Sequence, residues 1–262
     1  MDILHQYKKD IDTFLTSFLS SKEKDFSRVN PWGTVALEKI MGIISDGKTI
    51  RGSLVLLCHD MFGGKNKQDA LRVAAAYELV QTGFLIHDDI MDHDSIRRGK
   101  PAMHIQLKSE GLAICVGDIL FFLANELLDH TPVQTISAHI FQEVSIAQME
   151  DVAQTATTKK TIASLYTHKT ARYTFSLPMM AGAILAGADR QIINLLEKLG
   201  EDIGILFQIH DDRIDNDNNP FTDSDINTYR MSAEKLILRL PIQRRYKKNL
   251  QDLLHFVLTR QS

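Results

Sequence analysis

Two short acidic motifs carry the residues best suited to chemistry, DDIMD at residues 88–92 and DDRID at residues 211–215. Each motif follows an apolar run with helical spacing. On a helix, residues four apart share a face, so the first and last aspartates of each motif point the same way. Two carboxylates about 4 Å apart repel each other by roughly 4 kcal/mol at an effective dielectric near 20, unless a cation neutralises them. One copy of this pattern is typical of a solvated helix end, whereas two copies favour a site that binds cations.

The chemistry that these motifs favour is magnesium binding. Mg²⁺ prefers oxygen ligands, takes one or two carboxylates, and completes its shell with water and phosphate oxygens. Two clusters facing each other across a cavity would hold several metal ions, and those ions would bind a diphosphate. Arg97 and Arg98 follow the first motif closely, and guanidinium groups fork onto phosphate oxygens. Gly99 and Pro101 turn the chain after them.

Helical periodicity dominates the chain and predicts the elements that position both motifs. Breaks fall at glycines and prolines, such as Gly63–Gly64 and Pro220, and Pro178 is expected to kink the helix that it interrupts. No two-residue alternation is long enough to predict a sheet. We therefore predict an all-α fold, a large helical bundle formed by a single domain over residues 1–262. The expected helices lie in the N-terminal stretch and at residues 34–45, 53–62, 69–92, 112–129, 133–157, 171–187 and 190–215.

The composition of the chain limits the kinds of partner and cellular compartment that we expect for it. The chain has 262 residues, a formal net charge of -3 and 44% hydrophobic residues, which does not favour binding to nucleic acid. Cys58 and Cys115 lie among apolar neighbours, so buried free thiols and a reducing, cytoplasmic compartment are expected. The N-terminus lacks the pattern of a signal peptide, and no uninterrupted apolar stretch reaches the length that spans a bilayer.

Several stretches together resemble the trans-isoprenyl diphosphate synthases, the polyprenyl synthetase family. DDIMDHDSIRRGKP has the form of the family's first aspartate-rich motif, and FQIHDDRID has the form of its second. Between them, HKTARYTF resembles the segment with the family's Lys-Thr pair, AQMED its Gly-Gln-x-x-Asp, and CVGD its Gly-Asp. Upstream, DGKTIRG resembles its Gly-Gly-Lys-Arg-x-Arg-Pro. The order of these pieces from roughly residue 47 to residue 215 makes the resemblance specific.

The resemblance implies the isoprenoid synthase fold, all-helical around a central cavity. It also implies head-to-tail condensation of isopentenyl diphosphate with an allylic diphosphate. The diphosphate group of the allylic substrate leaves, the double bond of isopentenyl diphosphate attacks the resulting allylic cation, and a proton is then lost to the departing diphosphate. Several Mg²⁺ ions and a homodimer are further implications, with a heteromer as an alternative. No protein nucleophile is needed.

The resemblance also implies a role for each matching residue. Metal ligands would be Asp88, Asp92, Asp211 and Asp215, supported in catalysis by Asp89 and Asp212. Arg97 would bind the allylic diphosphate, and Lys48, Arg51, Gln81 and Arg98 would bind isopentenyl diphosphate. Lys169, Thr170 and Gln208 would face the allylic group, with Lys169 also catalytic.

The chain departs from the family pattern at four points. Thr49 stands in place of an arginine, Gly52 of a proline, and Gln81 of a histidine that helps to bind isopentenyl diphosphate. After the second motif the family has two Gly-Lys elements, but this chain has no lysine before Lys235 and carries acidic residues instead. We interpret the stretch from residue 216 as a solvated acidic loop, and RRYKK at residues 244–248 as a solvated helix face.

Product length is expected to depend on Phe84, which lies one helical turn before Asp88 and so shares its face. Gly83 beside it is expected to leave an open position, and the pair predicts a product of about C15 to C20.

Three functions remain open from the sequence. The first is an active short-chain prenyltransferase. The second is a weakly active or regulatory partner subunit of a heteromeric synthase, which the missing lysines, Gln81 and the short remainder favour. The third is a class I terpene cyclase, which usually carries an Asn/Ser/Glu-type second metal site rather than a second DDxxD.

Overall fold

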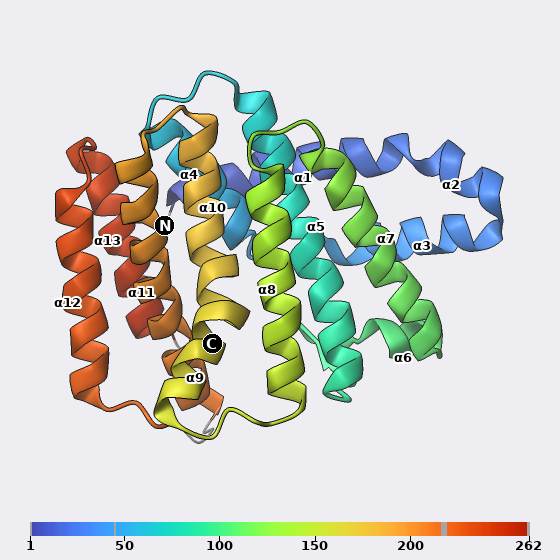
Figure 1. The fold of residues 1–262 in the computed structure, drawn as a ribbon. Coiled ribbons are helices and arrows are strands. Elements are labelled where there is room, and N and C mark those ends of the chain that lie inside the picture. Colours follow the sequence, from blue (N-terminus) through green and yellow to red (C-terminus); the bar gives the residue numbers. More distant parts are fainter. Residues whose placement is uncertain (1, 45, 216–218, 261–262) are drawn as a thin grey trace. The chain divides into compact units, whose positions relative to one another are not determined.

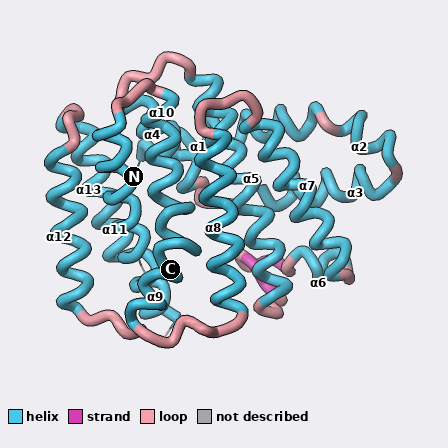
Figure 2. Tube along the Cα trace, in the orientation of Figure 1, coloured by secondary structure: helices cyan, strands magenta, loops and turns pink. Residues whose placement is uncertain are grey.

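In the part of the chain that the computed structural model describes, the regular elements are helices and one hairpin of two short strands (Figures 1 and 2). The structure describes residues 2–44, 46–215 and 219–260, and it describes their side chains except for residues 2–6 and 215. The chain forms two compact units. The N-terminal unit contains Ile3–Ser53 and Leu71–Thr131, and the C-terminal unit contains Leu54–Ala70 and the described residues from Pro132 onward. Each unit carries one acidic motif. The prediction of a single domain stays a prediction.

The N-terminal unit is built from long helices and two short ones. They are α1 (Asp2–Ser21), α2 (Glu23–Val29), α3 (Pro31–Ile44), α6 (Met103–Leu107), α7 (Glu110–Leu128) and the greater part of α5 (Lys67–Met91). Between α5 and α6 lies a hairpin of β1 (Ile96–Arg97) and β2 (Lys100–Pro101), paired antiparallel. Arg98 and Gly99 form its turn with φ of 53° and 74°, the left-handed backbone of a tight two-residue hairpin.

Close contact between α5 and α7 depends on glycines. A Cβ on Gly83 would lie 2.7 Å from Cε1 of Phe121 and 3.1 Å from the carbonyl oxygen of Gly117. The expectation that Gly83 leaves an open position beside Phe84 is therefore wrong. The missing side chain allows α7 to approach the backbone of α5.

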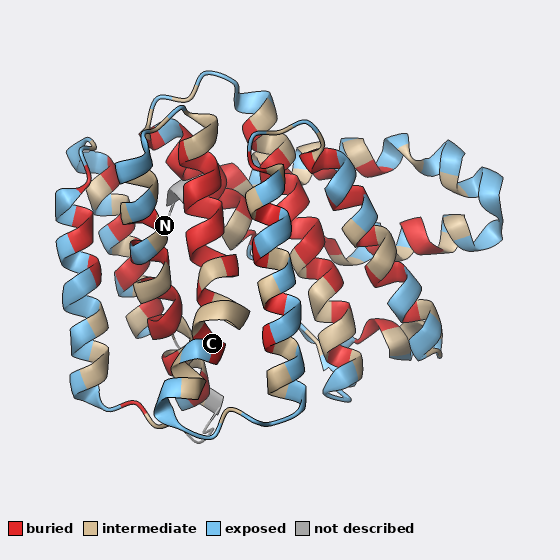
Figure 3. Cartoon of the chain, in the orientation of Figure 1, coloured by how far each residue is buried: buried red, intermediate tan, exposed pale blue. Residues whose placement is uncertain are grey.

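The C-terminal unit packs its helices around η1 and α11. Its elements are α8 (Gln134–Val152), α9 (Lys159–Leu165), the π-helix η1 (Tyr166–Ser176), α10 (Leu177–Leu185), α11 (Arg190–Asp215), α12 (Asp223–Arg239) and α13 (Arg244–Thr259), together with the part of α4 (Ile50–Met61) from Leu54. α10 is buried along most of its length (Figure 3). A Cβ on Gly204 of α11 would lie 2.3 Å from Cα of Ala171, so only glycine allows α11 to lie this close to η1.

Several expectations need correction. Cys58 is a buried free thiol, and burial raises its pKa well above the usual range, but Cys115 is exposed. Pro178 does not kink a continuous α-helix, because it stands in the first turn of α10, just after the chain changes from π-helix to α-helix. α2, α6, α9 and α12 lie outside the expected helices, and RRYKK, which was interpreted as a helix face, forms the first turns of α13.

One helix also passes a length and composition test for a membrane span. α7 has a mean hydropathy of 1.8 over its most apolar window, of which 44% is buried. The sequence reading had named no such segment. A core helix can pass the same test, so this is weak evidence for a span.

Candidate active site

The first acidic motif ends α5. The NH of Asp92 donates to the carbonyl of Asp88 at 2.8 Å, and the NH of Asp94 donates to the carbonyl of Asp89 at 2.9 Å. His93 between them has a φ of 58°, which is the left-handed residue that closes a helix in this way. Asp88 is half-buried and Asp92 is exposed, whereas Asp89 is only 2% exposed. The motif therefore presents two carboxylates outward and keeps one inside.

Arg97 neutralises the inward carboxylate. Its Nε donates to Oδ1 of Asp89 at 2.6 Å, its Nη2 contacts the same oxygen, and Nη2 also donates to Oδ2 of Asp94 at 3.1 Å. Burial raises the pKa of Asp89, and the hydrogen bond from Arg97 opposes that rise. For Arg97, the attraction of Asp89 outweighs burial and raises the pKa of the guanidinium. The β1–β2 hairpin thus positions the guanidinium of Arg97 beside the acidic motif that precedes it in the sequence.

A buried carboxylate also organises the basic segment upstream. Oε1 of Glu78 accepts a hydrogen bond from the NH of Gly52 at 2.8 Å, and Glu78 attracts Arg51 and Arg98 electrostatically. Proline lacks this NH, and a Cβ at position 52 would lie 2.8 Å from Cδ1 of Ile11, so glycine suits the position in this chain. Burial raises the pKa of Glu78. The arrangement holds the start of α4, where Arg51 lies.

Three further residues of this unit, discussed from the sequence, differ in their exposure to solvent. Lys48 is exposed and Gln81 half-buried, so both side chains can reach solvent. Thr49, which stands in place of an arginine, is 2% exposed with a φ of 48°. It therefore cannot replace the arginine as a solvent-facing donor.

The helical turns before Asp88 pack against α7. The Phe84 and Phe121 ring centroids lie 5.1 Å apart, and the rings of His87 and Phe121 meet edge-on at 5.4 Å. Nε2 of His87 lies 3.2 Å from the carbonyl oxygen of Ile114 and 3.7 Å from Oδ1 of Asp118. Phe121 thus contacts both side chains, and sequence reasoning had not singled it out.

The second motif is organised around Asp212. This side chain is 8% exposed and receives three donors. Nε2 of Gln208 donates to Oδ1 at 2.8 Å, Nδ2 of Asn219 donates to Oδ2 at 3.0 Å, and the hydroxyl of Tyr166 donates to Oδ2. Thr170 extends the network because its hydroxyl donates to Oε1 of Gln208 at 2.9 Å. The structure thus brings together three of the expected residues, Thr170, Gln208 and Asp212.

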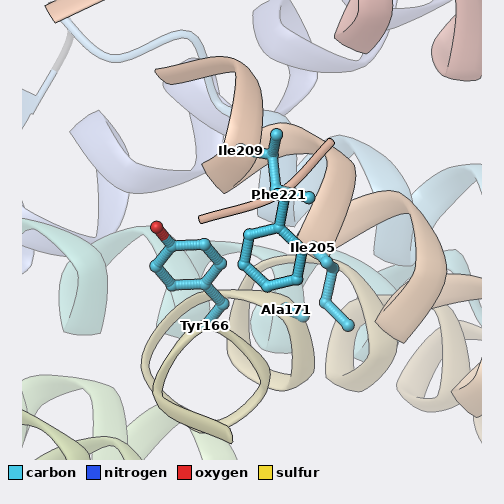
Figure 4. Packing of buried hydrophobic residues seen from close by; sticks show 5 residues of the cluster. All are labelled: Tyr166, Ala171, Ile205, Ile209 and Phe221. Atoms are coloured by element: carbon cyan, nitrogen blue, oxygen red, sulfur yellow. The ribbon is translucent and has the colours of Figure 1, made fainter. Parts of the chain in front are cut away.

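A buried apolar cluster packs around the ring of Tyr166 and so supports this hydrogen-bond network. Tyr166 and Phe221 have ring centroids 5.6 Å apart and form a buried cluster with Ala171, Ile205 and Ile209. Figure 4 shows the two rings beside each other, with the hydroxyl oxygen of Tyr166 pointing out of the cluster. The apolar cluster fixes the ring of Tyr166, and the ring in turn aims its hydroxyl at Asp212.

The π-helix η1 carries Lys169 and Thr170 on consecutive residues. π-helical turns are rare and concentrate at functional sites, because the wider turn changes the directions of the side chains. Nζ of Lys169 forms an ion pair with Asp151 of α8, which belongs to the AQMED stretch. Two of the short motifs in the sequence therefore meet in the folded unit.

The structure describes the side chain of Asp211 but not that of Asp215. Asp211 is half-buried and forms an ion pair with Arg260, which follows α13. Asp215 is the last residue of α11, and its side chain lies outside the described residues.

The donor chemistry of both motifs fits a hard cation that is shared with a ligand. No group of three or more His, Cys, Asp or Glu among the described residues is placed to hold a metal by itself. Mg²⁺ does not require such a group, since it is usually bound by one or two carboxylates together with water and phosphate oxygens. Asp88 and Asp92 are accessible enough to share a metal ion with water and phosphate, whereas Asp89 and Asp212 are buried.

Sequence reasoning missed Tyr166, Asn219 and Arg260. Asn219 had been assigned to the solvated loop, but its Nδ2 reaches Asp212 and its Oδ1 accepts from the NH of Phe221 at 2.9 Å. Residues 216–218 of that loop lie outside the described residues. A buried tyrosine and an arginine beyond an amphipathic helix carry no local signal of their partners.

Known proteins give this arrangement a context. Residues 34–227 match the family described as Polyprenyl synthetase. The chain is 36% identical over 225 residues to the short chain isoprenyl diphosphate synthase of Methanothermobacter thermautotrophicus, covering 82% of this chain and 66% of that protein. It is 30% identical over 232 residues to the farnesyl diphosphate synthase of Geobacillus stearothermophilus, covering 81% and 74%. It spans 54% of the geranylgeranyl diphosphate synthase of Sulfolobus acidocaldarius, at 35% identity and 64% of this chain. The chain is thus shorter than these curated relatives.

A solved structure shows the same fold. The geranylgeranyl pyrophosphate synthase of Corynebacterium glutamicum, crystallised with isoprenyl diphosphate and magnesium, superposes with a TM-score of 0.85 at 20% identity, covering 98% of this chain and 99% of that one. The all-α prediction is therefore confirmed, and the fold is that of the isoprenoid synthases. With the family match over residues 34–227 and the identities to these relatives, the chain belongs to the polyprenyl synthetase family.

Proposed function

We propose that this chain is a Mg²⁺-dependent prenyltransferase that condenses isopentenyl diphosphate with an allylic diphosphate, head to tail, to a product of about C15 to C20. One observation carries the proposal. Each DDxxD motif lies at the end of a long helix, and in each motif one carboxylate is buried and hydrogen-bonded. Arg97 satisfies Asp89, and three uncharged donors satisfy Asp212. A helix end kept only for solubility has no need of such an internal anchor.

The anchored aspartates position the ones that bind. Asp88, Asp92, Asp211 and Asp215 are the proposed ligands of Mg²⁺, and the bound ions would stabilise the diphosphate as it leaves. Because Asp89 and Asp212 are held by several hydrogen bonds, each fixes the last turns of its helix and thereby the directions of the neighbouring carboxylates. Preorganised charge of this kind costs no reorganisation during the reaction.

Basic and polar side chains are proposed to hold the two substrates. Lys48, Arg51, Gln81 and Arg98 would bind the diphosphate of isopentenyl diphosphate, and Arg97 that of the allylic substrate. Glu78 supports this assignment, because it holds the start of α4 beside Arg51 and attracts Arg98.

The π-helix is proposed to face the allylic group. Thr170 and Gln208 are linked by a hydrogen bond, so their oxygens are held in fixed positions. Lys169 is held by Asp151 and would add a positive charge beside the leaving diphosphate.

The proposed assembly and cellular location follow from the exposed apolar side chains and the two cysteines. We propose a homodimer, since the N-terminal unit exposes the apolar side chains of Val29, Trp32 and Phe122. A second copy is the simplest cover for them, and sedimentation velocity of the purified chain measures it. We also propose a cytoplasmic location, with the two cysteines reduced. No nucleic-acid partner and no membrane span are proposed.

The test is an assay of the purified full chain with Mg²⁺, labelled isopentenyl diphosphate and dimethylallyl, geranyl and farnesyl diphosphates, with products sized by chromatography. Asp88→Ala and Asp211→Ala are expected to abolish turnover, and EDTA is expected to stop the wild-type reaction. Asp252→Ala, which removes a carboxylate paired with Lys248 on α13, is the control and should retain activity. Full activity in the presence of EDTA would contradict the proposal.

A second candidate is a weakly active partner subunit of a heteromeric synthase. The observation that favours it is the absence from the sequence of any lysine between Asp215 and Lys235. If the chain alone turns over slowly but accelerates when mixed with a complete synthase subunit, this candidate replaces the first. Conversion of an allylic diphosphate alone into a hydrocarbon would instead identify a terpene cyclase.

A further inference from the structure

Arg260 contacts the second acidic motif although nearly fifty residues separate them. Its guanidinium Nη2 forms an ion pair with Oδ1 of Asp211 and donates to the carbonyl oxygen of Phe207 at 3.3 Å. The guanidinium also lies over the ring of Phe207, 3.7 Å from its centroid. Nε2 of His210 donates to the carbonyl oxygen of Arg260 at 2.7 Å. Three residues of α11 therefore hold one arginine at the motif.

The side chain of Arg260 is buried to an unusual degree for an arginine. Only 7% of it is exposed, and its Nε has no hydrogen-bond partner among the residues that the structure describes. Buried charges are normally paired and their polar atoms satisfied, because an unmet donor costs free energy. The guanidinium of Arg260 can therefore donate a further hydrogen bond, from Nε, to an anionic ligand beside the acidic motif.

Other arginines near the motif are used differently. Arg213 and Arg230 line the same groove as Arg260, which has a volume of about 650 Å³. Arg213 donates to Asp223 at 3.0 Å, and Arg230 donates to Glu234 at 3.2 Å. Both partners belong to α12 rather than to the motif. Arg260 is thus the cation of this groove that contacts an expected metal ligand.

We propose that Arg260 binds the diphosphate held at the second acidic motif, and that it occupies Asp211 until metal and diphosphate arrive together. The inference rests on the proposed function, because it takes Asp211 as a metal ligand. It supplies a positive charge in a chain that has no lysine between Asp215 and Lys235. An arginine suits the task, since its planar fork can move from a carboxylate to two phosphate oxygens while it stays charged.

Competition for Asp211 has a measurable consequence. A metal ion that binds without diphosphate must displace Arg260 from Asp211 and leave a buried guanidinium without its carboxylate. When diphosphate binds as well, the guanidinium gains a new acceptor. Metal and diphosphate should therefore strengthen each other's binding, and Arg260 should carry part of that coupling.

Arg260→Gln separates the two effects. Without diphosphate, the variant should bind Mn²⁺ more tightly than the wild type at the class of sites lost in Asp211→Asn. With Mn²⁺ present, it should bind inorganic diphosphate more weakly. Each change should be about tenfold to a hundredfold, the range that one charge-assisted hydrogen bond supplies.

The experiment titrates Mn²⁺ into the full chain by electron paramagnetic resonance, with and without inorganic diphosphate. Arg230→Gln is the matched control, because it removes a charge from the same groove without touching Asp211, and it should behave as the wild type. Arg260→Lys should fall between wild type and Arg260→Gln. A circular dichroism melt of each variant identifies any that fail to fold, and Arg260→Lys then carries the test.

Two outcomes separate failure of this inference from failure of the proposed function. If Arg260→Gln binds Mn²⁺ alone no more tightly than the wild type, or binds diphosphate equally well, Arg260 is a structural contact and the inference is wrong. If the wild type and Asp211→Asn bind Mn²⁺ and diphosphate alike, the second motif is not a metal site, and the proposed function itself is contradicted.

Discussion

Removing the hydroxyl of Tyr166 tests whether Asp212 is the structural anchor of the second motif. Tyr166→Phe keeps the ring against Phe221 and removes only the donor to Asp212. Gln208 and Asn219 still donate to the carboxylate, so it is not left without partners. A hydrogen bond to a charged group contributes about 1.5–3 kcal/mol, and we expect a loss of about 2 kcal/mol in the free energy of unfolding.

The chain offers a close control for this change. Tyr246 is also a buried tyrosine of the C-terminal unit; its hydroxyl donates at 3.2 Å to the backbone carbonyl of Asp60 and accepts from Nη2 of Arg245 at 3.0 Å. The carbonyl is neutral, and Arg245 is exposed, so water can replace the hydroxyl as its partner. Tyr246→Phe should therefore cost less, about 0.5–1.5 kcal/mol. Urea titration followed by circular dichroism gives both values, and thermal melts should show a fall in Tm of about 4–8 °C for Tyr166→Phe.

A double-mutant cycle with Asp212→Asn completes the test. If Asp212 is the partner that matters, Tyr166→Phe should cost much less in the Asp212→Asn background than in the wild type. Equal losses in the two backgrounds, or equal losses for Tyr166→Phe and Tyr246→Phe, would show that the bond from Tyr166 to Asp212 contributes no special stability to the second motif.

Three further changes test the N-terminal unit. Gln81→His should lower the KM for isopentenyl diphosphate, because histidine can carry the charge that glutamine lacks; an unchanged KM in steady-state assays would contradict the assignment of Gln81. Phe84→Ala should lengthen the product, since it removes the ring that packs on Phe121, and chromatography of the products measures this; an unchanged product distribution would make Phe84 an ordinary core residue. Glu78→Gln tests a pH dependence. Burial raises the pKa of Glu78 above its usual value, so the folded state retains this proton at a pH where the unfolded state has lost it. The stability from this group therefore falls as pH rises through the folded pKa. Glutamine keeps an oxygen for the NH of Gly52, so thermal melts between about pH 4 and pH 8 should show the variant gaining on the wild type as pH rises, and a constant difference would refute this.

Local patterns in the sequence were sufficient to predict most of the long helices and the two motifs, but not α2, α6, α9 or α12. The spacing of aspartates places Asp88 and Asp92 together whatever the rest of the fold does, and FQIHDDRID continues the apolar periodicity of α11 to its last residue. The order of the short motifs led to the correct family. The roles of the individual site residues stay predictions.

What the sequence could not supply are contacts between distant residues. Tyr166 lies 46 residues from Asp212, and nothing around it distinguishes it from another core tyrosine. Gly83 was interpreted as open space because its own neighbours say nothing about Phe121 on α7. Arg260 lies beyond α13, and only the packing of α13 against α11 brings it to Asp211. In each case the decisive partner belongs to another element.

The π-helix η1 makes the chain sensitive to changes in length. Each residue of a helix advances the side chains by a fixed angle around the axis, about 100° in an α-helix and less in a wider π-helix, so a single deletion rotates one end of the helix relative to the other. η1 has Tyr166 and Thr170 bonded to Asp212 and Gln208 at one end, and Ser176 bonded to the carbonyl of Glu197 at the other. Both ends are therefore tied to α11. Homologous chains can change residue types within this segment, but an insertion or deletion of one residue would detach one end from α11, so the number of residues here is itself a constraint on sequence divergence.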